Sequence, residues 1–237
     1  LCAIRLAEIE AGRAPDDLST KIMTARDGDS GEGFDLPEMV DQVAIFFLAG
    51  HETSASALSW ALYLLARDPE AQSRVAAEAA GAMEGGEYGF EVLSRLAFTR
   101  DVFRETLRLY PPVPMMVREA AKPERFRGRK VPQGAQIVMS PWHLHRHERL
   151  WPDPDDFDPD RWSRDGGAAC PREAWMPFSA GPRVCTGAGF AMAEGVLLLA
   201  QIVRAFALAP APGPEPVPVA HLTVRARDGI RLRLTPR

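Results

Sequence analysis

The sequence contains very little cysteine. Its 237 residues include only Cys2, Cys170 and Cys185, an odd number with no C-x-x-C pair. Disulfide frameworks and structural zinc sites both need several cysteines at set spacings, so the sequence argues against both kinds of site. A low cysteine content of this kind is typical of a reducing compartment, and we expect a cytoplasmic protein.

An excess of positive charge is also missing. Lys and Arg number 28 against 32 Asp and Glu, which gives a formal net charge of -4. Nucleic-acid-binding domains generally gather an excess of basic residues on one face. The composition therefore predicts no nucleic-acid partner.

The sequence has no uninterrupted apolar run suited to crossing a membrane. The most apolar stretch, residues 43–66, carries His51 and Glu52 near its middle, whereas a spanning helix needs about 20 mainly apolar residues. We interpret this stretch as a buried helix of a soluble protein. The chain starts at Leu1 with neither an initiator Met nor a signal-peptide pattern. We therefore expect it to begin inside a larger protein, which leaves a membrane anchor upstream of Leu1 as an open alternative.

The residues that are present predict a mainly helical chain with small β-sheets. Asp35, Pro37 and Glu38 form a helix-start pattern, and Asp68-Pro69 forms a second one. The predicted helices cover residues 37–66, 69–83, 92–109 and 187–206. Strand-like residues 117–140 turn at Arg127-Gly128 and at residues 132–134, and a hairpin over residues 222–234 turns at Asp228-Gly229. There are no internal repeats, so we expect residues 1–237 to form a single unit.

The strongest chemical signal is the ten-residue segment from Phe178 to Gly187, FSAGPRVCTG, which leads directly into an apolar helix. A thiolate at Cys185 would be favoured by the positive end of that helix. Glycines at 181 and 187 allow tight turns and a close approach to a flat ligand. Arg183 can pair with a carboxylate on the ligand's rim, and Phe178 can keep water from the sulfur. The alternative is a buried structural cysteine in a glycine-rich turn.

These ten residues resemble the haem-binding signature of the cytochrome P450 family. Three further segments resemble motifs of the same family: AGHET at residues 49–53, ETLR at residues 105–108 and FDPDRW at residues 157–162. Each short motif is weak alone, but the four together in the family's order are specific. The resemblance covers the chain from about residue 35 to its C-terminus, so it implies a P450-like fold that lacks its N-terminal portion.

The resemblance implies a role for each candidate residue. Cys185 ligates the iron of haem b, and Phe178, Arg183 and Gly187 surround the cofactor from the same loop. Arg118 lies beside a haem propionate, although an arginine on the surface of a strand remains an alternative. On the long helix, Gly50 leaves room for oxygen, Thr53 hydrogen-bonds dioxygen and Glu52 relays protons to it. The other interpretation is that Thr53 bonds its own helix and Glu52 faces water.

The resemblance also implies a structural cluster. Glu105 and Arg108 lie three residues apart on one helix face, and Arg161 joins them in a buried network that supports the cysteine loop. A surface ion pair worth little is the alternative. The histidines at 143, 145 and 147 have a spacing that suits a metal site on a strand, but the same stretch matches a polar segment of the family.

Together these features predict a haem-thiolate monooxygenase that activates O2 and oxidises a small, hydrophobic organic substrate. No flavin, ferredoxin or dinucleotide motif is present in the sequence, so an external redox partner, a ferredoxin or a flavoprotein reductase, must supply electrons. Three alternatives stay open: a truncated chain, a non-catalytic haem-binding protein and a peroxide-using haem-thiolate enzyme. The Glu52-Thr53 pair argues against the last of these.

Overall fold

The computed structural model describes residues 1–86, 88–164 and 172–237, and Cys170 lies outside them. The described chain divides into two compact units, Leu1–Glu52 and Thr53–Arg237. The helix α3 (Leu36–Arg67) contributes its first half to one unit and its second half to the other. That residues 1–237 form a single domain stays a prediction.

The first unit contains α1 (Cys2–Glu10), α2 (Leu18–Thr24) and the start of α3. The predicted capping box is confirmed, because Glu38 N–H donates to Asp35 Oδ1 at 2.8 Å and Asp35 N–H donates to Glu38 Oε2 at 2.9 Å. In this half of α3, Ile45, Phe47 and Leu48 are 57%, 75% and 69% exposed. The expectation of a helix buried along its whole length is therefore wrong for this half.

The second unit holds the remaining helices and all the named strands. Its α-helices are the second half of α3, α4 (Pro69–Ala82), α5 (Ala97–Leu109), α6 (Pro141–Leu144) and α7 (Ala188–Ala205). Its 3-10 helices are η1 (Phe90–Arg95), η2 (Pro159–Trp162), η4 (Arg172–Ala174) and η5 (Gly181–Arg183). Its strands are β1 (Met116–Glu119), β2 (Glu124–Phe126), β3 (Arg129–Val131), β4 (Gln136–Met139), β5 (Phe206–Pro210), β6 (Pro218–Ala220), β7 (Val224–Ala226) and β8 (Leu232–Pro236). The fold is thus mainly helical with small antiparallel sheets, as the sequence predicts.

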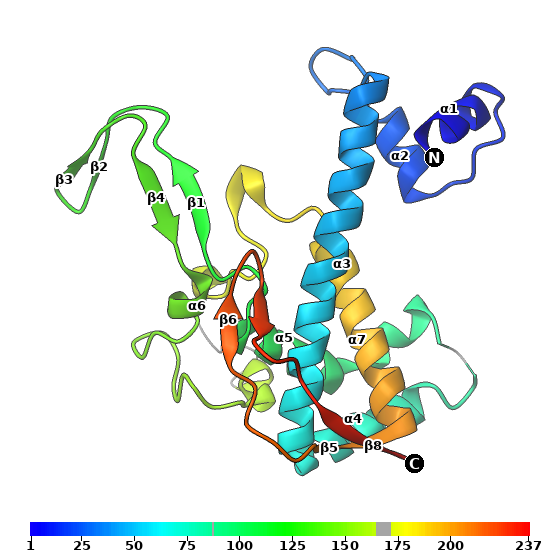
Figure 1. The fold of residues 1–237 in the computed structure, drawn as a ribbon, viewed down its shortest axis with the longest axis vertical. Coiled ribbons are helices and arrows are strands. Elements are labelled where there is room, and N and C mark those ends of the chain that lie inside the picture. The colour runs from blue at the N-terminus through cyan, green and yellow to red at the C-terminus, as the bar shows by residue number, and fades with distance from the viewer. Residues whose placement is uncertain (87, 165–171) are drawn as a thin grey trace. The chain divides into compact units, whose positions relative to one another are not determined.

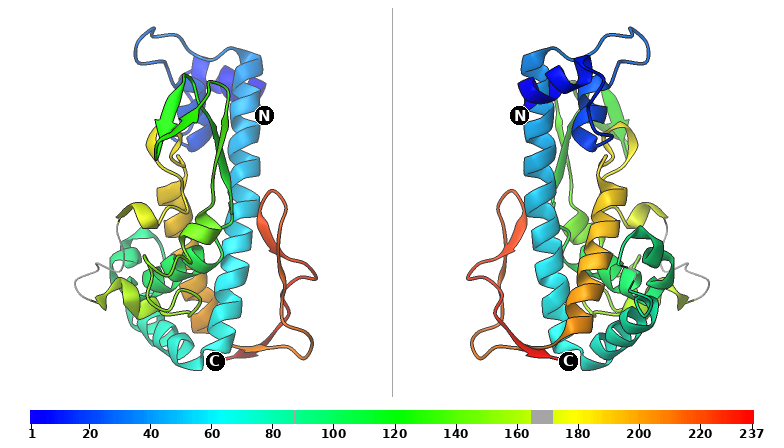
Figure 2. Two further views of the ribbon diagram at one scale, coloured as in Figure 1. Left: turned by 90° about the vertical axis from the view of Figure 1, so that its left-hand side faces the viewer. Right: turned by 90° about the vertical axis from the view of Figure 1, so that its right-hand side faces the viewer.

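The core of this unit lies between the second half of α3 and helices α4, α5 and α7, which run beside one another in Figures 1 and 2. Gly195 of α7 is essential to this packing, since a Cβ there would lie 2.1 Å from Phe103 Cζ of α5. Among the described residues, α7 is the one helix with the length and mean hydropathy, 1.4, of a possible membrane span. Its Val196, Leu199 and Val203 are buried in the core, so it is a core helix of this unit.

Helix α5 starts later than the sequence predicts. The predicted start is near residue 92, but residues 90–95 form η1 and α5 begins at Ala97. The cause is a cap from another helix: Glu78 of α4 accepts hydrogen bonds from the N–H groups of Phe98 and Thr99 at 2.7 and 2.8 Å. A carboxylate at this point satisfies free N–H groups and complements the helix dipole.

The strands confirm one predicted hairpin and correct another. β2 and β3 pair around Arg127-Gly128, and β1 pairs with β4 outside them. The predicted hairpin over residues 222–234 is wrong, because β7 pairs with β6 and β8 pairs with β5. Gly229 does form a turn, with φ +78°. The strands on either side of this turn, β7 and β8, do not pair with each other. The partner of β7 is β6, and the partner of β8 is β5, which follows α7 directly.

Candidate active site

The cysteine loop, residues 178–187, contains η5 and leads directly into α7. Cys185 N–H donates to the Phe178 carbonyl at 2.8 Å, and Val184 N–H donates to the Gly181 carbonyl at 3.0 Å. Gly181 has φ +68°, a conformation that glycine adopts readily. The thiol of Cys185 is free and exposed. The loop therefore presents a sulfur at the positive end of an 18-residue helix.

The other predicted residues of this loop differ in their surroundings. Phe178 is half-buried, packs on the core and meets Trp175 edge to face, with ring centroids 6.2 Å apart. A Cβ at Gly187 would lie 3.9 Å from Cys185 Sγ, so Gly187 keeps the space beside the sulfur open. Arg183 is exposed.

Arg118 is brought to the cysteine loop by a direct hydrogen bond. This half-buried residue of β1 donates from Nη2 to Ser179 Oγ at 2.8 Å. It also donates from Nη1 to the carbonyl of Val117 at 2.9 Å. Two residues 61 positions apart in sequence therefore place a guanidinium next to the cysteine loop.

The predicted oxygen-side residues lie around the boundary between the two units. Gly50 and Glu52 belong to the first unit, and Thr53 begins the second. Glu52 and Thr53 are half-buried, and Gly50 is exposed. Helix α3 is continuous through Gly50.

Thr53 stands one turn from the point where α3 is fixed within its unit. Ser56 and Trp60 both donate hydrogen bonds to the carbonyl of Val224 in β7, the latter at 3.4 Å. The Trp60 ring also stacks on Tyr110, with centroids 4.0 Å apart and planes 3° from parallel. These contacts hold the backbone that carries Thr53 against the C-terminal strands.

The predicted cluster of Glu105, Arg108 and Arg161 is confirmed. Arg108 Nε and Nη2 donate to the two oxygens of Glu105 at 2.9 and 2.8 Å, and Arg161 Nε donates to Glu105 Oε1 at 2.8 Å. Glu105 and Arg108 are fully buried, and Arg161 is 4% exposed. The Trp162 indole and the Asp158 N–H also donate to Glu105, both at 3.1 Å. The surface-pair alternative is therefore excluded.

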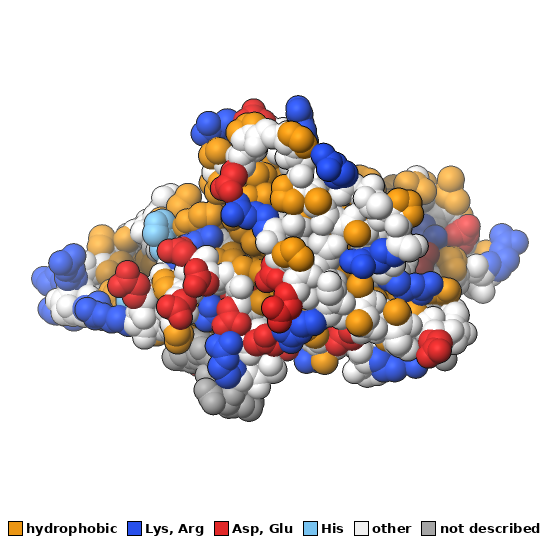
Figure 3. Space-filling model, turned by 90° about the horizontal axis from the view of Figure 1, so that it is seen from below, with side chains coloured by type: hydrophobic (Ala, Val, Ile, Leu, Met, Phe, Trp, Pro, Cys, Tyr) orange, Lys and Arg blue, Asp and Glu red, His pale blue; other side chains and the backbone are white. Residues whose placement is uncertain are grey.

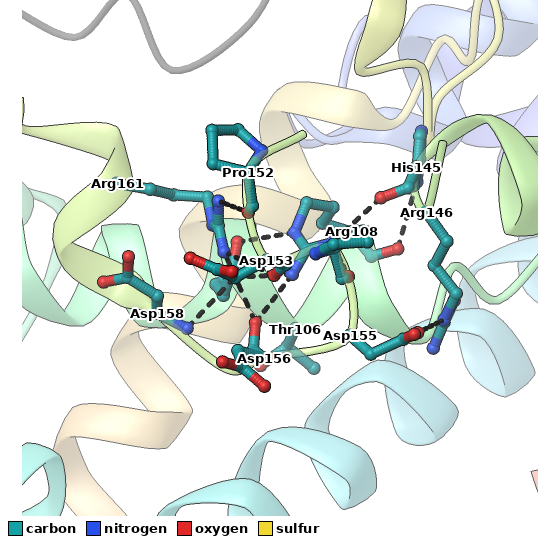
Figure 4. A network of polar contacts seen from close by, with 12 residues as sticks. Thr106, Arg108, His145, Arg146, Pro152, Asp153, Asp155, Asp156, Asp158 and Arg161 are labelled. Atoms are coloured by element: carbon teal, nitrogen blue, oxygen red, sulfur yellow. Dashed lines mark hydrogen bonds and ion pairs between the residues drawn. The ribbon is translucent and has the colours of Figure 1, made fainter. Parts of the chain in front are cut away.

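The two guanidiniums also hold the irregular segment that follows α6, as Figure 4 shows. Arg108 donates to the carbonyls of His145 and Asp156, each at 2.8 Å, and to that of Pro154. Arg161 donates to the Pro152 carbonyl at 2.9 Å. Charged donors on carbonyl groups fix a segment that has no regular backbone pairing of its own.

His145 links this cluster to the approach to the cysteine loop, a role that its sequence position does not reveal. Its Nδ1 pairs with the Arg108 carbonyl at 3.2 Å, and its Nε2 accepts the N–H of Met176 at 2.9 Å. The ring is therefore neutral, and burial lowers its pKa to about 4. Among the described residues, no group of three His, Cys, Asp or Glu side chains is placed to hold a metal.

Three tryptophans fill the space between the cluster and the loop. Trp151, Trp162 and Trp175 meet edge to face in that order, with centroid separations of 5.7 and 5.4 Å, and Phe178 follows Trp175. Edge-to-face contacts are a favoured geometry of aromatic pairs. This aromatic row packs the loop's base against the cluster.

A cavity of about 620 Å³ lies elsewhere in the second unit. It is lined by the C-terminal end of α3, the proline-rich residues 210–216 and the turn at residues 228–231. None of the predicted site residues lines it.

The site's donor set fits a haem group. A free, exposed thiol stands at a helix N-terminus, and an arginine bonded to the same loop can meet a carboxylate of the ligand. The family model described as Cytochrome P450 matches residues 5–233.

Curated relatives come from bacteria and mammals. Cyclooctat-9-en-7-ol 5-monooxygenase of Streptomyces melanosporofaciens is 40% identical over 200 residues, 84% of this chain and 44% of that protein. Cyclooctatin synthase of the same organism is 38% identical, over 82% of this chain and 42% of its own length. Cytochrome P450 4X1 of Mus musculus is 36% identical, over 92% of this chain and 45% of its own length. The chain thus spans less than half the length of each of these relatives.

The buried cluster predicts a large effect for Arg108→Ala. The variant leaves the Glu105 carboxylate buried with only one guanidinium, and breaking a buried pair costs about 3–5 kcal/mol. We expect this loss in the free energy of unfolding, together with poor haem incorporation. Arg164→Ala is the control, because it breaks an exposed pair with Asp158, for which we expect a loss below about 1 kcal/mol. An Arg108→Ala protein as stable as this control would contradict the role of the cluster.

The buried His145 predicts a stability change with pH. Burial lowers the pKa of His145 to about 4 in the folded protein, below the 6.5 of an exposed histidine, so the unfolded chain binds the proton more readily. The stability contributed by neutral His145 is present above pH 6.5 and is lost as the pH falls from 6.5 through 4. The loss amounts to about 3 kcal/mol.

This change is measured by urea unfolding at several pH values, for the parent and for His145→Gln. The difference in unfolding free energy between the two should shrink as the pH falls across that window. Carboxylates titrate in both proteins and cancel in the difference. His221→Gln, at an exposed position, should follow the parent throughout. Parallel curves for the parent and His145→Gln would show that this ring does not titrate with folding.

Proposed function

Since the chain belongs to the cytochrome P450 family, we propose that it carries the haem-binding part of a haem-thiolate monooxygenase. Such an enzyme takes up O2, receives electrons from an external donor, inserts one oxygen atom into an organic substrate and releases the other as water. The observation that carries the proposal is the free Cys185 thiol at the start of α7, in a loop to which Arg118 is bonded.

Cys185 is the proposed iron ligand. When haem b is bound, it supplies the redox chemistry, and electron density from a thiolate ligand favours cleavage of the O–O bond. The chain's own contribution is to position the sulfur. Cys185 lies at the N-terminus of α7, and the backbone bond from Cys185 to Phe178 fixes the loop that carries it. Phe178, which packs on the core, is the proposed shield of the sulfur side from water once haem is bound.

Arg118 and Arg183 are the proposed partners of the haem propionates. Guanidinium groups stay charged and pair with carboxylates in a fixed geometry. The bond from Nη2 to Ser179 holds the Arg118 guanidinium at the loop, and Nη1 bonds to the Val117 carbonyl; each of these nitrogens keeps a second N–H for a carboxylate. Gly187 leaves the face beside the sulfur free of a side chain. Gly50 is proposed to do the same on the oxygen side.

Glu52 and Thr53 are the proposed proton-handling pair. The Thr53 hydroxyl would hold a proton for the O2 substrate, and Glu52 would replenish that proton from solvent. A positioned acid or hydroxyl of this kind contributes about 10²–10⁴-fold to proton-transfer steps. The pair also favours O2 over peroxide as oxidant, because peroxide already carries the protons and electrons that O2 must acquire.

The partners follow from the same chemistry. The streptomycete relative is named for the oxidation of cyclooctat-9-en-7-ol, in keeping with a small hydrophobic organic substrate here. We propose a ferredoxin or a flavoprotein reductase as the external redox partner and the cytoplasm as the location.

Cys185→Ala tests the ligand. In the haem-loaded protein, we expect the reduced, carbon monoxide-bound spectrum to lose the band that marks thiolate ligation, and monooxygenase activity to vanish. Cys2→Ala is the matched control, since Cys2 lies in α1 of the other unit, and it should leave the spectrum unchanged. Retention of the thiolate band without Cys185 would refute the assignment.

Thr53→Ala tests the proton-handling role. Electron uptake should continue, but more of the reductant should end as hydrogen peroxide and less as product. Because the variant affects proton delivery and not haem binding, haem content should stay as in the parent. Reductant consumption, peroxide release and product are measured together, with Ser59→Ala, an exposed hydroxyl on the same helix, as the control. Unchanged coupling in Thr53→Ala would leave that residue without a part in proton delivery.

A further inference from the structure

The cavity of about 620 Å³ in the second unit is bordered by a proline-rich strap, residues 211–217. Two backbone hydrogen bonds join the ends of this strap to the turn that follows β7. At one end, Ala211 N–H donates to the Arg231 carbonyl at 3.2 Å. At the other end, Arg227 N–H donates to the Val217 carbonyl at 2.9 Å. The strap, the turn and the C-terminal end of α3 line the cavity between these two bonds.

The sequence of the strap makes this wall of the cavity rigid. Its second, fourth and sixth residues are proline. A proline ring fixes φ and removes the backbone N–H, so the strap cannot continue the strand pairing on either side of it. Gly213 has φ +141°, in the region that favours glycine. Because the wall is rigid, the cavity exists before a ligand arrives, which lowers the entropic cost of binding.

The cavity combines an apolar surface with a few charged groups. Tyr63 and Ala66 of α3 are 7% and 5% exposed, and they form the apolar part together with the prolines. The charged lining residues are Arg67, Glu215, Asp228 and Arg231. Figure 3 views the structure from the end at which Figure 1 shows the C-terminal end of α3, and charged side chains of both signs lie there among hydrophobic ones. Small-molecule sites usually have this composition and a volume of about 300–1,000 Å³.

One arginine of the cavity already holds a carboxylate. Arg67 Nη1 donates to the carboxylate of Glu215 in the strap, and also to the Tyr63 hydroxyl at 3.0 Å. The side chain of Glu215 is 74% exposed, so this ion pair contributes little to stability. Glu215 can therefore give up its place on Arg67 to another carboxylate.

The other arginine of the cavity can take a carboxylate from outside the chain. Within the part of the chain that the structure describes, no carboxylate forms an ion pair with Arg231. Its backbone is fixed, because its carbonyl accepts the N–H of Ala211 and the next residue begins β8. Arg231 therefore offers a guanidinium from a fixed backbone position in the cavity wall.

We propose that this cavity binds an organic carboxylate with an apolar body. The carboxylate would pair with Arg231 and compete with Glu215 for Arg67, since guanidiniums bind carboxylates in a fixed geometry. The apolar body would pack on Tyr63, on Ala66 and on the prolines of the strap. None of the proposed haem-site residues lines the cavity, so the proposal is independent of haem binding and of the proposed reaction.

The lining also limits the charge of the ligand. Glu215 and Asp228 offset the two arginines, so the four charged groups of the lining sum to zero. A ligand with one carboxylate loses little to repulsion from these acids, whereas a phosphate ester with about two negative charges loses more. A monoanion is therefore the favoured ligand class.

The test measures the affinity of the haem-loaded protein for 4-phenylbutyrate by isothermal titration calorimetry. 4-Phenylbutyramide, which has the same shape without the charge, should bind at least about tenfold more weakly. Acetate, which lacks the apolar body, should also bind at least about tenfold more weakly. The haem absorption spectrum, recorded over the same titration, should not change, because no residue of the cysteine loop lines the cavity.

Four substitutions should change the affinity for 4-phenylbutyrate in opposite directions. Arg231→Gln and Arg67→Gln each remove a charged donor and should weaken binding by about tenfold. Glu215→Gln removes the competing carboxylate from Arg67 and should strengthen binding by about fivefold. Asp228→Asn removes a like charge from the lining and should strengthen binding by about twofold.

The matched controls are Arg233→Gln and Glu148→Gln, because both residues are exposed and neither lines the cavity. They change the net charge equally and should leave the affinity within about twofold of the parent. Thermal unfolding of every variant checks that it folds.

Three results would overturn the proposal: a Kd for 4-phenylbutyrate weaker than about 10 mM, equal binding of the amide, or cavity variants that bind as the controls do. A haem spectral change that the cavity variants leave unaltered would place the ligand at the haem and would also contradict it.

Discussion

The rest of the second unit depends on the hydrogen bonds that the buried carboxylate of Glu105 accepts. A charge with no exposure to water is costly unless its hydrogen bonds are complete. Two guanidiniums, one indole and one backbone N–H complete them here. Arg108 and Arg161 donate their remaining N–H groups to backbone carbonyls within residues 145–156. One carboxylate thereby organises a long segment that has little regular structure.

That organisation extends to the proposed iron ligand through short steps. Arg108 and His145 are joined by two hydrogen bonds, each from the side chain of one to the carbonyl of the other, and His145 Nε2 accepts the N–H of Met176, two residues before Phe178. Phe178 then accepts the N–H of Cys185. The aromatic row from Trp151 to Phe178 packs the same path. Glu105 can therefore affect how rigidly Cys185 is held without contacting the proposed haem. A preorganised site requires such rigidity.

The two sides of the proposed site are supported in different ways. The cysteine side is fixed by hydrogen bonds from several elements, including Arg118 of β1. On the oxygen side, the α3 backbone that carries Thr53 is fixed by Ser56 and Trp60 against the carbonyl of Val224. The cavity beside the proline-rich strap belongs to neither side, since no residue of the proposed haem site lines it. Its arginines are therefore free to bind a ligand of their own.

The sequence by itself determined the local features, because they depend on residues that are close along the chain. The capping box of Asp35 and Glu38, the cap at Asp68, the turn at Arg127-Gly128 and the motif around Cys185 were all readable in this way. Only the tertiary structure decided what depends on distant partners. Glu78 sets the start of α5 from another helix, β7 and β8 pair with β6 and β5 and not with each other, and His145 joins Arg108 to Met176. These hydrogen bonds join residues far apart in sequence and leave no periodicity or spacing behind, so no local pattern predicted them. The equally distant bond from Arg161 to Glu105 was expected only through the family resemblance.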